Sequence, residues 1–357
     1  MKVMFENLGP IKKGRIELNR LNIFCGKNNT GKTYINYLIY TILTTINNLN
    51  FKNNKEFIKE LSKDKREIEI NLEEVLFKEN YLKELLLNIE EKITERLPVI
   101  FSVSKDFFKN FKIKIDYDSI NLNKKIHPNR FFFIGDHYGI IEKEGINIKI
   151  RLDEEFKNEI GETFDLDFNI SRNQPNEIER INRVITNYII AIIFNLKRVY
   201  PFPAERSGLA IFYNELLIRR SNILDSFVRE NRDEEILKDM VSRYPKPIND
   251  YINFLSQMPR VMERQTRKNN KFIQLAEDIE KNFLCGEYKV KDNKKIVYVT
   301  ENGKELELYT SSSLVKTVVG IINYLKYFAV KGDYFLIDEP ELNLHPENQR
   351  KIARIFA

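Results

Sequence analysis

The sequence predicts an α/β fold with a mixed sheet, a glycine-rich loop, and helical plus β insertions between that loop and an acidic strand end. Three observations predict it. A short apolar run at residues 21–25 enters the glycine-rich loop, and an apolar helical pattern follows. A second apolar run, at 334–337, ends in two acidic residues. Between the two runs, stretches of helical spacing alternate with stretches of strand spacing.

The first 50 residues predict two surface strands, a buried strand and a buried helix. Residues 3–6 and 14–18 alternate in the manner of strands on either side of a Gly-Pro turn. Residues 21–25 are mostly apolar and bounded by glycine, which is typical of a strand covered on both faces. Residues 31–49 carry apolar side chains at helical spacing almost all round, so we expect this helix in the interior.

The remaining elements follow from the same two periods. Strands are predicted wherever apolar residues alternate with polar ones, and helices wherever they recur every three or four residues. In chain order we predict helices over 51–98, strands at 111–117, 131–134 and 146–150, a helix over 176–196, a strand entering a loop at 199–208, helices over 210–284, strands at 287–290, 295–299 and 305–308, a helix over 314–330, a strand at 334–337 and a helix over 346–356.

Composition favours a helix-rich protein of the cytoplasm. Hydrophobic residues make up 42% of the 357 residues and charged residues 31%, which allows a sizeable core under a charged surface. No run of about 18 apolar residues predicts a membrane span, no signal peptide is present, and two cysteines make no disulfide framework. We therefore expect no membrane partner. The net charge of +6 is compatible with nucleic acid, although a solvated surface with a slight lysine excess is the simpler explanation.

Residues 26–33 fit the phosphate-binding motif G-x-x-x-x-G-K-[ST] at every position. Its glycines let main-chain N–H groups curl round phosphate oxygens, and the following helix adds its dipole. We predict ATP as the ligand, Lys32 as a catalytic cation on the phosphates, and the Thr33 hydroxyl as a ligand of Mg²⁺. A chance glycine-rich loop is the alternative. The predicted nucleotide-binding residues are Gly26, Lys27, Asn28, Asn29, Thr30, Gly31, Lys32, Thr33 and Tyr34.

The apolar run at 334–337 predicts a strand that delivers two carboxylates to its C-terminal end, where open α/β sheets bind their ligands. We predict that Asp338 holds Mg²⁺, directly or through water, and that Glu339 is the general base for the attacking water. An acidic turn without a ligand is the alternative, and the intact phosphate-binding motif disfavours it.

The segment from Asp338 to Pro346, with its Asp-Glu-Pro turn and its Leu-His-Pro run, resembles the Walker B motif and D-loop of ABC-class ATPases. More narrowly, it is similar to the ABC-like group that includes OLD (overcoming lysogenisation defect) proteins and SMC- and recF-type heads. The resemblance is strongest over residues 1–50 and 286–357. It implies a P-loop ABC-type ATPase head that hydrolyses ATP to ADP and phosphate. Residues 51–285 then form an inserted lobe or helical arm, from which 197–209 returns to the core.

In ABC enzymes a signature segment contacts the γ-phosphate that the other subunit holds, and residues 309–314 occupy the matching place. Both glycines of the usual signature are absent, but serine hydroxyls at a helix N-terminus suit a phosphate oxygen. The resemblance thus implies trans contacts from Ser311, Ser312 and Ser313 without choosing among them, and a plain serine cap is the alternative. It also implies Arg206 near phosphate or the subunit interface, while a structural salt bridge is equally consistent.

ABC heads carry a further strand with a switch histidine, but only 18 residues follow Glu339 (357 − 339), and His345 lies within the D-loop. The sequence leaves open whether the native chain continues with that strand or with a nuclease domain. No glutamine of a Q-loop can be placed.

The resemblance implies two heads that sandwich two ATP molecules, in a homodimer or a higher even-numbered oligomer. ATP would then switch a nuclease or toxin effector in antiviral defence or DNA maintenance. DNA binding is a further hypothesis because residues 260–271 are basic, although a solvated helix face is the alternative. A low-turnover ATP-binding scaffold that sequesters an effector also stays open. A transporter nucleotide-binding subunit is disfavoured by the long insertion and the missing glycines.

Overall fold

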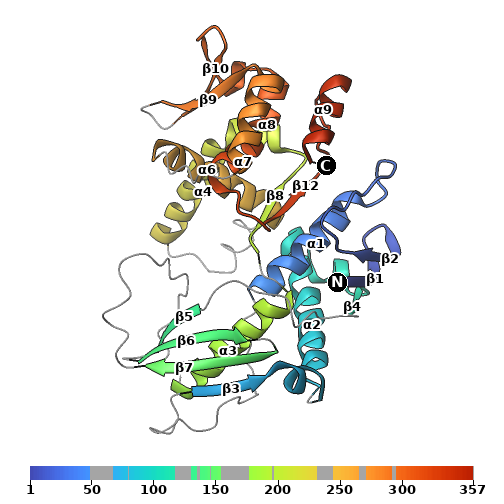
Figure 1. The fold of residues 1–357 in the computed structure, drawn as a ribbon. Helices are drawn as coiled ribbons and strands as arrows, with labels where there is room; N and C mark the ends of the chain where they lie inside the picture. The colour runs from blue at the N-terminus through green and yellow to red at the C-terminus, as the bar shows by residue number, and fades with distance from the viewer. Residues whose placement is uncertain are drawn as a thin grey trace. The chain divides into compact units, whose positions relative to one another are not determined.

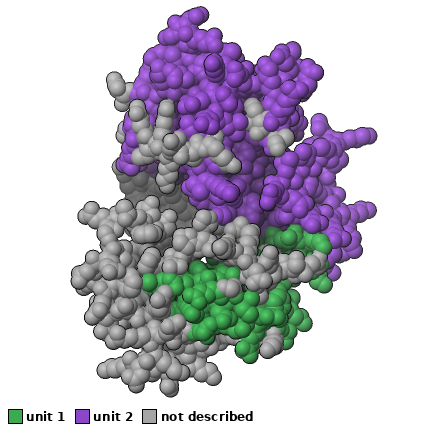
Figure 2. Space-filling model, viewed as in Figure 1, with its two compact units in different colours: residues 1–2, 45–92, 114–196 green, residues 3–44, 93–113, 197–357 purple. Residues whose placement is uncertain are grey.

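The structure, a computed structural model, divides the chain into two compact units, each with sheets and helices of its own (Figure 1 and Figure 2). The first unit contains residues 1–2, 45–92 and 114–196, and the second contains residues 3–44, 93–113 and 197–357. The structure describes residues 1–48, 67–78, 80–116, 130–134, 137–144, 146–153, 177–194, 197–230, 244–264, 271–291 and 295–356.

The first unit is built on a four-stranded antiparallel sheet in the order β3-β7-β6-β5. Ile148 and Ile150 alternate with polar residues and are buried, so one face of the sheet is apolar. Ile185 and Ile189 on the neighbouring helix are also buried, one turn apart. The elements are β3 (Glu67–Asn71), β5 (Arg130–Ile134), β6 (His137–Glu144), β7 (Asn147–Asp153) and α3 (Glu177–Phe194).

Part of the region predicted as helical, 51–98, is a strand. Residues 67–71 alternate glutamate and isoleucine before the last residue, and pairing with β7 satisfies their main chain, so they form β3. A π-helical turn, η1 (Glu74–Lys78), and a long helix, α2 (Tyr81–Phe101), follow. The helical prediction is confirmed for α2, whose side chains at 85, 89, 93 and 97 are all buried. Residues 51–66 lie outside the described part of the chain.

A three-stranded sheet has the order β2-β1-β4 and is formed by β1 (Lys2–Leu8), β2 (Ile11–Glu17) and β4 (Lys112–Asp116). Val3, Phe5 and Leu8 are buried beneath it. A Cβ on Gly14 would lie 2.3 Å from the Phe5 ring, so only glycine fits where β2 crosses that ring. The predictions of two opening strands and of a strand at 111–117 are confirmed.

The predicted buried strand at 21–25 is wrong. These residues form no ladder, and Leu21 and Ile23 are 52% and 75% exposed. Asparagine side chains hold this part of the chain in a local turn: the Asn19 N–H donates to Oδ1 of Asn22 (2.9 Å), and Nδ2 of Asn22 donates to the Glu17 carbonyl (2.7 Å). Asparagine competes with regular structure in this way because its side chain bonds the nearby main chain.

The buried helix that the sequence predicts after the glycine-rich loop is α1 (Lys32–Asn47), and most of its side chains beyond Tyr37 are buried. Tyr40 in α1 donates a hydrogen bond to the carboxylate of Asp250, which also pairs with Lys246. Both partners belong to α6 (Lys246–Glu263), so a partly buried polar contact joins α1 to this helix of the second unit.

Two short parallel strands, β8 (Val199–Phe202) and β12 (Tyr334–Ile337), lie next to each other, and β12 leads into Asp338 and Glu339. They pair in the register Val199↔Tyr334 to Phe202↔Ile337. The Asp338 N–H continues this ladder with a bond to the Phe202 carbonyl (2.9 Å). Both strand predictions are confirmed. The sequence did not show that the two strands are neighbours, since 131 residues separate Phe202 from Tyr334.

Helices and a meander complete the second unit around one apolar cluster. Phe202, Tyr251, Phe254, Tyr324 and Phe335 meet ring to ring within it, with centroids 4.4–5.9 Å apart. The remaining elements are α4 (Arg206–Glu230), α7 (Lys271–Ile279), the π-helical η4 (Glu280–Leu284), β9 (Gly286–Val290), β10 (Ile296–Thr300), β11 (Glu305–Glu307), α8 (Ser313–Asn323), the π-helical η6 (Tyr324–Phe328) and α9 (Pro346–Phe356).

The sequence predicts an insertion at 51–285 from which 197–209 returns to the core, and the two compact units follow other boundaries. Residues 93–113 and 197–285 belong to the second unit, together with the glycine-rich loop and β12. The physical reason is packing: β8 pairs with β12, and the side chains of α4 and α6 join the same apolar cluster as those of α8. Much of the long interval between the two motifs therefore belongs to the unit that carries them.

Candidate functional site

The glycine-rich loop runs over residues 26–31 and leads directly into α1. Asn29 and Gly31 have positive φ, at 62° and 100°. A Cβ on Gly31 would lie 2.8 Å from the Ile11 side chain, and one on Gly26 would lie 2.9 Å from Oγ1 of Thr30. Glycine is thus required at both ends of the loop, by conformation at one and by space at both.

The side chains of Lys32 and Thr30 stabilise the loop by hydrogen bonds to its own carbonyl oxygens. The Lys32 ammonium donates to the carbonyl oxygens of Gly26 (3.0 Å) and Lys27 (3.1 Å), and the Thr30 hydroxyl donates to the Lys27 carbonyl (2.8 Å). The ammonium therefore lies against the loop itself. Phosphate oxygens bound in the loop would have this cation within reach.

The N-terminus of α1 is open to an anion. Its first turn contains no acidic residue, and its first main-chain bond runs from the Ile35 N–H to the Gly31 carbonyl (3.0 Å). The leading N–H groups of a helix have no partners within it, and the helix dipole is positive at this end. Together with the loop that precedes it, this end of α1 fits a phosphate group.

The acidic turn, residues 338–340, follows β12 directly. Asp338 is 7% exposed, and Glu339, which is partly exposed, has a φ of +45°. A positive φ is uncommon for a residue with a Cβ and is a form of strain often found at functional sites. The strand thus ends in one buried carboxylate and one carboxylate on a strained backbone.

The acidic turn and α1 both belong to the second unit. Tyr40 of α1 bonds Asp250 of α6, and side chains of α6 share an apolar cluster with those of β8 and β12. The pKa of the Tyr37 hydroxyl is raised, first by burial and then by the negative charges of Glu205 and Asp338. Tyr37 is one helical turn beyond Thr33, so the two side chains project from the same side of α1. The predicted metal ligands, Thr33 and Asp338, belong to the same compact unit. A hydroxyl and a carboxylate are the oxygen donors that Mg²⁺ prefers, so this pair fits the ion.

Arg206, predicted near phosphate, at the subunit interface or in a salt bridge, lies beside the acidic turn. It is the first residue of α4, it is 1% exposed, and its guanidinium bonds only main-chain carbonyls among the described residues. Nη1 donates to Asp338 (2.8 Å) and Pro203 (3.2 Å), and Nη2 donates to Glu339 (2.8 Å) and Pro340 (3.1 Å). Arg206 therefore holds the acidic turn, and its burial keeps it from reaching a phosphate or a second chain.

The three serines ahead of α8 have different environments. Ser311 is buried, and its hydroxyl donates to the Glu307 carbonyl (2.9 Å). Ser312 is the N-cap of α8 and accepts from the Val315 N–H (3.4 Å). Ser313 is exposed, and its hydroxyl donates to the Asn343 carbonyl (3.2 Å), in the segment that follows the acidic turn. Of the three, Ser312 and Ser313 are the ones that an outside group can reach.

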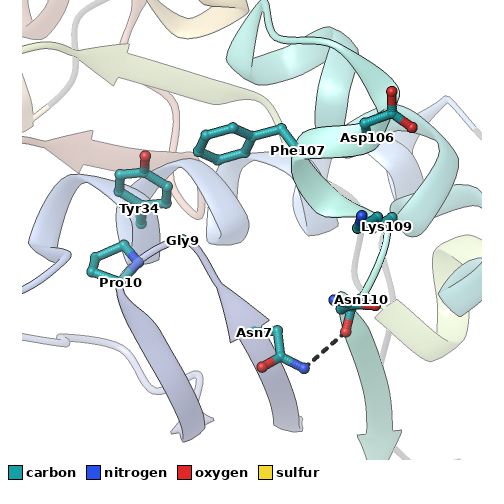
Figure 3. Close-up of a pocket in the computed structure, with 8 residues that line it drawn as sticks. All are labelled: Asn7, Gly9, Pro10, Tyr34, Asp106, Phe107, Lys109 and Asn110. Carbon is teal, nitrogen blue, oxygen red and sulfur yellow. Dashed lines mark hydrogen bonds between the residues drawn. The ribbon is translucent and has the colours of Figure 1, made fainter.

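A cavity of about 330 Å³ lies beside the start of α1 (Figure 3). The rings of Tyr34 and Phe107 line it, and elsewhere on its wall Nδ2 of Asn7 donates to the Asn110 carbonyl (2.9 Å). A Cβ on Gly9 would lie 2.1 Å from the Tyr34 ring, so the turn between β1 and β2 fits this ring only as glycine. The remaining lining residues are Pro10, Asp106 and Lys109.

Sequence reasoning placed Tyr34 at the site but missed the rest of this cavity. Phe107 follows the long helix α2 in a short 3₁₀ turn (Lys105–Phe108), more than 70 residues after the glycine-rich loop. Its one signal is a large aromatic side chain that stays 51% exposed, which the sequence alone does not reveal.

Other predicted features do not join the site. The basic cluster at 260–271 is only partly described, because residues 265–270 lie outside the described part of the chain. Nδ1 of His345 accepts a weak bond from the Glu347 N–H (3.4 Å). Within the described ranges, no three His, Cys, Asp or Glu side chains gather as a metal site. No described helix combines the length and apolar character needed to cross a membrane.

The whole chain, residues 1–357, matches the protein family described as AAA ATPase domain. No curated protein and no solved structure matches the chain. The family match covers both the glycine-rich loop and the acidic turn, and ATP binding by a P-loop ATPase accords with the geometry of both. On this match, the chain belongs to the AAA ATPase domain family.

Proposed function

We propose that the protein hydrolyses ATP at a site formed by the glycine-rich loop, the start of α1 and the acidic turn. The observation that carries this proposal is that the glycine-rich loop with the start of α1 belongs to the same compact unit as the acidic turn, with its buried Asp338 and strained Glu339. A phosphate-binding loop without a nearby carboxylate can hold a nucleotide, but it lacks a group to activate water. Here both parts belong to one unit.

Each residue has a distinct part in this proposal. Main-chain N–H groups of the loop and the Lys32 ammonium bind the phosphates, and Thr33 and Asp338 hold Mg²⁺. When bound, Mg²⁺ neutralises charge on the phosphate oxygens. Glu339 orients the attacking water and accepts its proton, which suits a carboxylate that is partly exposed at the edge of the acidic turn.

The cavity beside α1 is our proposed site for the base of the nucleotide. Tyr34 directly follows Thr33, and a Cβ on Gly31 would lie 3.2 Å from Pro10, so the cavity wall is continuous with the phosphate-binding loop. Two aromatic rings offer faces for stacking, and Asn7 and Asp106 offer polar groups for the base edge.

We further propose that ATP joins two copies of the chain. In this arrangement the exposed serines, Ser312 and Ser313, reach the γ-phosphate that the other copy holds. Ser313 bonds the carbonyl of Asn343, just beyond the acidic turn, so a phosphate that draws this hydroxyl away also alters the surroundings of that turn. The ATP-bound pair then switches an effector, with antiviral defence or DNA maintenance as the setting that the sequence resemblance supports. Stimulation of turnover by DNA would support the DNA-linked form of this role.

Two substitutions test hydrolysis, with ATP binding and phosphate release measured separately on the full chain. Lys32→Ala removes the cation and is expected to abolish ATP binding. Glu339→Gln keeps the shape of the side chain but removes the base, so binding should persist while turnover falls roughly 10²- to 10⁴-fold. Glu341→Gln, at an exposed carboxylate nearby, is the matched control and should change neither. Unchanged turnover in Glu339→Gln would show that Glu339 is not the general base. A biological function that survives the loss of turnover in Glu339→Gln would favour the scaffold that binds ATP without needing to hydrolyse it.

A further inference from the structure

We propose that Arg206 is a positioning residue for Glu339: its guanidinium fixes the main chain of the acidic turn so that the Glu339 carboxylate faces the attacking water. This inference rests on the proposed hydrolysis. It assigns to a buried arginine of α4 a part in catalysis that it performs without touching the nucleotide.

The contacts of Arg206 converge on one short stretch of main chain. The carbonyl oxygens of three consecutive residues, 338 to 340, all accept hydrogen bonds from it, at 2.8, 2.8 and 3.1 Å. The fourth bond, to the carbonyl of Pro203, ties the guanidinium to the start of its own helix. A turn whose successive carbonyls all face one cation cannot rotate any of these peptide groups without breaking a charge-assisted bond.

Glu339 needs such support because its backbone is strained. Its φ of +45° places a residue with a Cβ in the left-handed region, at a cost of roughly 1–2 kcal/mol. The Leu342 N–H also bonds the Glu339 carbonyl (3.0 Å), but a neutral bond of this kind contributes only about 1 kcal/mol. Bonds from a charged donor contribute about 1.5–3 kcal/mol each, enough to offset the strain.

Burial and bonding geometry separate this role from a direct contact with phosphate. Arg206 is 1% exposed, and both of its terminal nitrogens are already bonded to carbonyls. Nε has no hydrogen-bond partner among the described residues, so nothing else there orients the side chain through that atom. The hydrogen bonds of the guanidinium thus go mainly to the acidic turn.

Lysine cannot reproduce this arrangement. The guanidinium is planar and donates hydrogen bonds to the carbonyls of residues 338 and 339 from two different nitrogens. An ammonium carries its three donors on a single nitrogen, on a side chain with no rigid end. Arg206→Lys therefore keeps the charge in the interior but loosens the peptide groups on either side of Glu339.

The test measures ATP affinity and turnover of the full chain carrying Arg206→Lys. We expect kcat to fall roughly 100-fold while the Kd for ATP stays within about threefold, since the carboxylate moves and the phosphate-binding loop does not. Arg198→Lys is the matched control. Arg198 also bonds a carbonyl, that of Phe328, and pairs with Asp333, but at the opposite end of the β8–β12 strands. This control should leave kcat and Kd unchanged.

A double-mutant cycle provides a result that a merely structural role would not give. If Arg206 acts through Glu339, then Arg206→Lys will not lower the residual turnover of Glu339→Gln any further. Losses that multiply, a Kd that rises as kcat falls, or an unchanged kcat would each overturn the inference.

Absence of turnover in the unaltered chain would overturn the proposed hydrolysis itself, which distinguishes the two failures. Should the lysine variant fail to fold, as circular dichroism would show, Arg206→Gln takes its place with the same expectations.

Discussion

At the residue scale, four of the left-handed backbone positions lie in the glycine-rich loop or at and after the acidic turn. Asn29 and Gly31 adopt positive φ in the glycine-rich loop, and Glu339 and Asn343 do so at and after the acidic turn. Asparagine and glycine accept this conformation readily, whereas glutamate does so at a cost. Glu339 is thus, with Ser102 and Cys285, one of the positions at which the chain keeps a costly residue in this conformation. Such strain is common where a side chain is needed for chemistry, and Glu339 is the proposed general base.

Tyr251 gives a prediction about stability. Its hydroxyl is buried without a hydrogen-bond partner among the described residues, and a Cβ on Gly320 would lie 2.3 Å from it. Burial also raises the pKa of this hydroxyl. A buried polar group without a partner costs about 1–3 kcal/mol, so Tyr251→Phe should raise the free energy of unfolding in urea by about 1 kcal/mol. A loss of stability would show that the hydroxyl does have a partner.

Phe107 gives a prediction about ligand binding. If the base of ATP stacks in the cavity beside α1, then Phe107→Ala should weaken ATP binding by about 1–3 kcal/mol, the usual contribution of a stacked aromatic. Inorganic triphosphate lacks the base, so its affinity should not change. Phe77→Ala is the matched control, because Phe77 is exposed to a similar degree (49% against 51%) and belongs to the first unit. Equal losses for ATP and triphosphate would contradict this location for the base.

At the scale of elements, two π-helical segments are joined by a buried ion pair. Lys326 in η6 donates to Glu280 in η4 at 2.5 Å, and their side chains are only 6% and 10% exposed. Breaking such a pair costs more than the pair contributes, because the remaining charge has no partner in the interior. Lys326→Met should therefore lower the free energy of unfolding at neutral pH by about 3–5 kcal/mol. The double variant Glu280→Leu, Lys326→Met should recover most of this loss.

The same pair predicts a pH dependence. Burial raises the pKa of Glu280 above its ordinary value of 4.5, while the bond from Lys326 and its charge oppose the rise. A carboxyl with a raised pKa holds its proton more tightly in the folded state, so its contribution to stability falls as the pH rises from 4.5 through the folded-state pKa. Without the Lys326 ammonium, the folded-state pKa of Glu280 rises further, so stability is lost over a pH range that extends to higher pH. Denaturant titrations should therefore show that Lys326→Met is least harmful at acidic pH, and a pH-independent loss would contradict the account.

The elements also show how far the sequence alone could lead. Helices and strands with strong periodicity, such as α1 and β12, were predicted correctly because burial of one face or of all faces leaves a clear pattern. The strand expected at 21–25 failed because Asn19 and Asn22 bond the local main chain, which an apolar count does not register.

The two motifs were recognisable because phosphate and Mg²⁺ demand particular residues at fixed spacing. The role of Arg206 could not be predicted, since it depends on the chain folding back to bring Asp338, 132 positions further along, beside it. The same limit applies to the cavity, whose wall brings Phe107 to the turn between β1 and β2. Long-range pairing of this kind leaves no local period in the sequence.

At the scale of the whole molecule, the glycine-rich loop, α1, the acidic turn and the serines ahead of α8 all belong to the second unit. The proposal nevertheless divides them between the two copies that form each ATP site. The serines ahead of α8 bond elsewhere: Ser312 caps its helix, and Ser313 bonds the Asn343 carbonyl. Our proposal is that these serines contact the γ-phosphate held by a second copy, and it has a direct test.

The test mixes two inactive variants. One carries Lys32→Ala, and the other carries Ser312→Ala with Ser313→Ala. In a dimer with composite sites, a mixed pair contains one site in which the intact Lys32 and Glu339 of one copy meet the intact serines of the other, so mixing should restore turnover. Loss of the Ser312 cap costs only about 1 kcal/mol, which a folded chain tolerates. The matched control mixes Lys32→Ala with Glu339→Gln: both defects fall in the half-site that a single copy supplies, so neither site of the mixed pair is whole and no turnover should return. If turnover recovers in the first mixture and not in the control, the serines act in trans. If turnover does not recover in the first mixture, the serines have only their structural role at the start of α8.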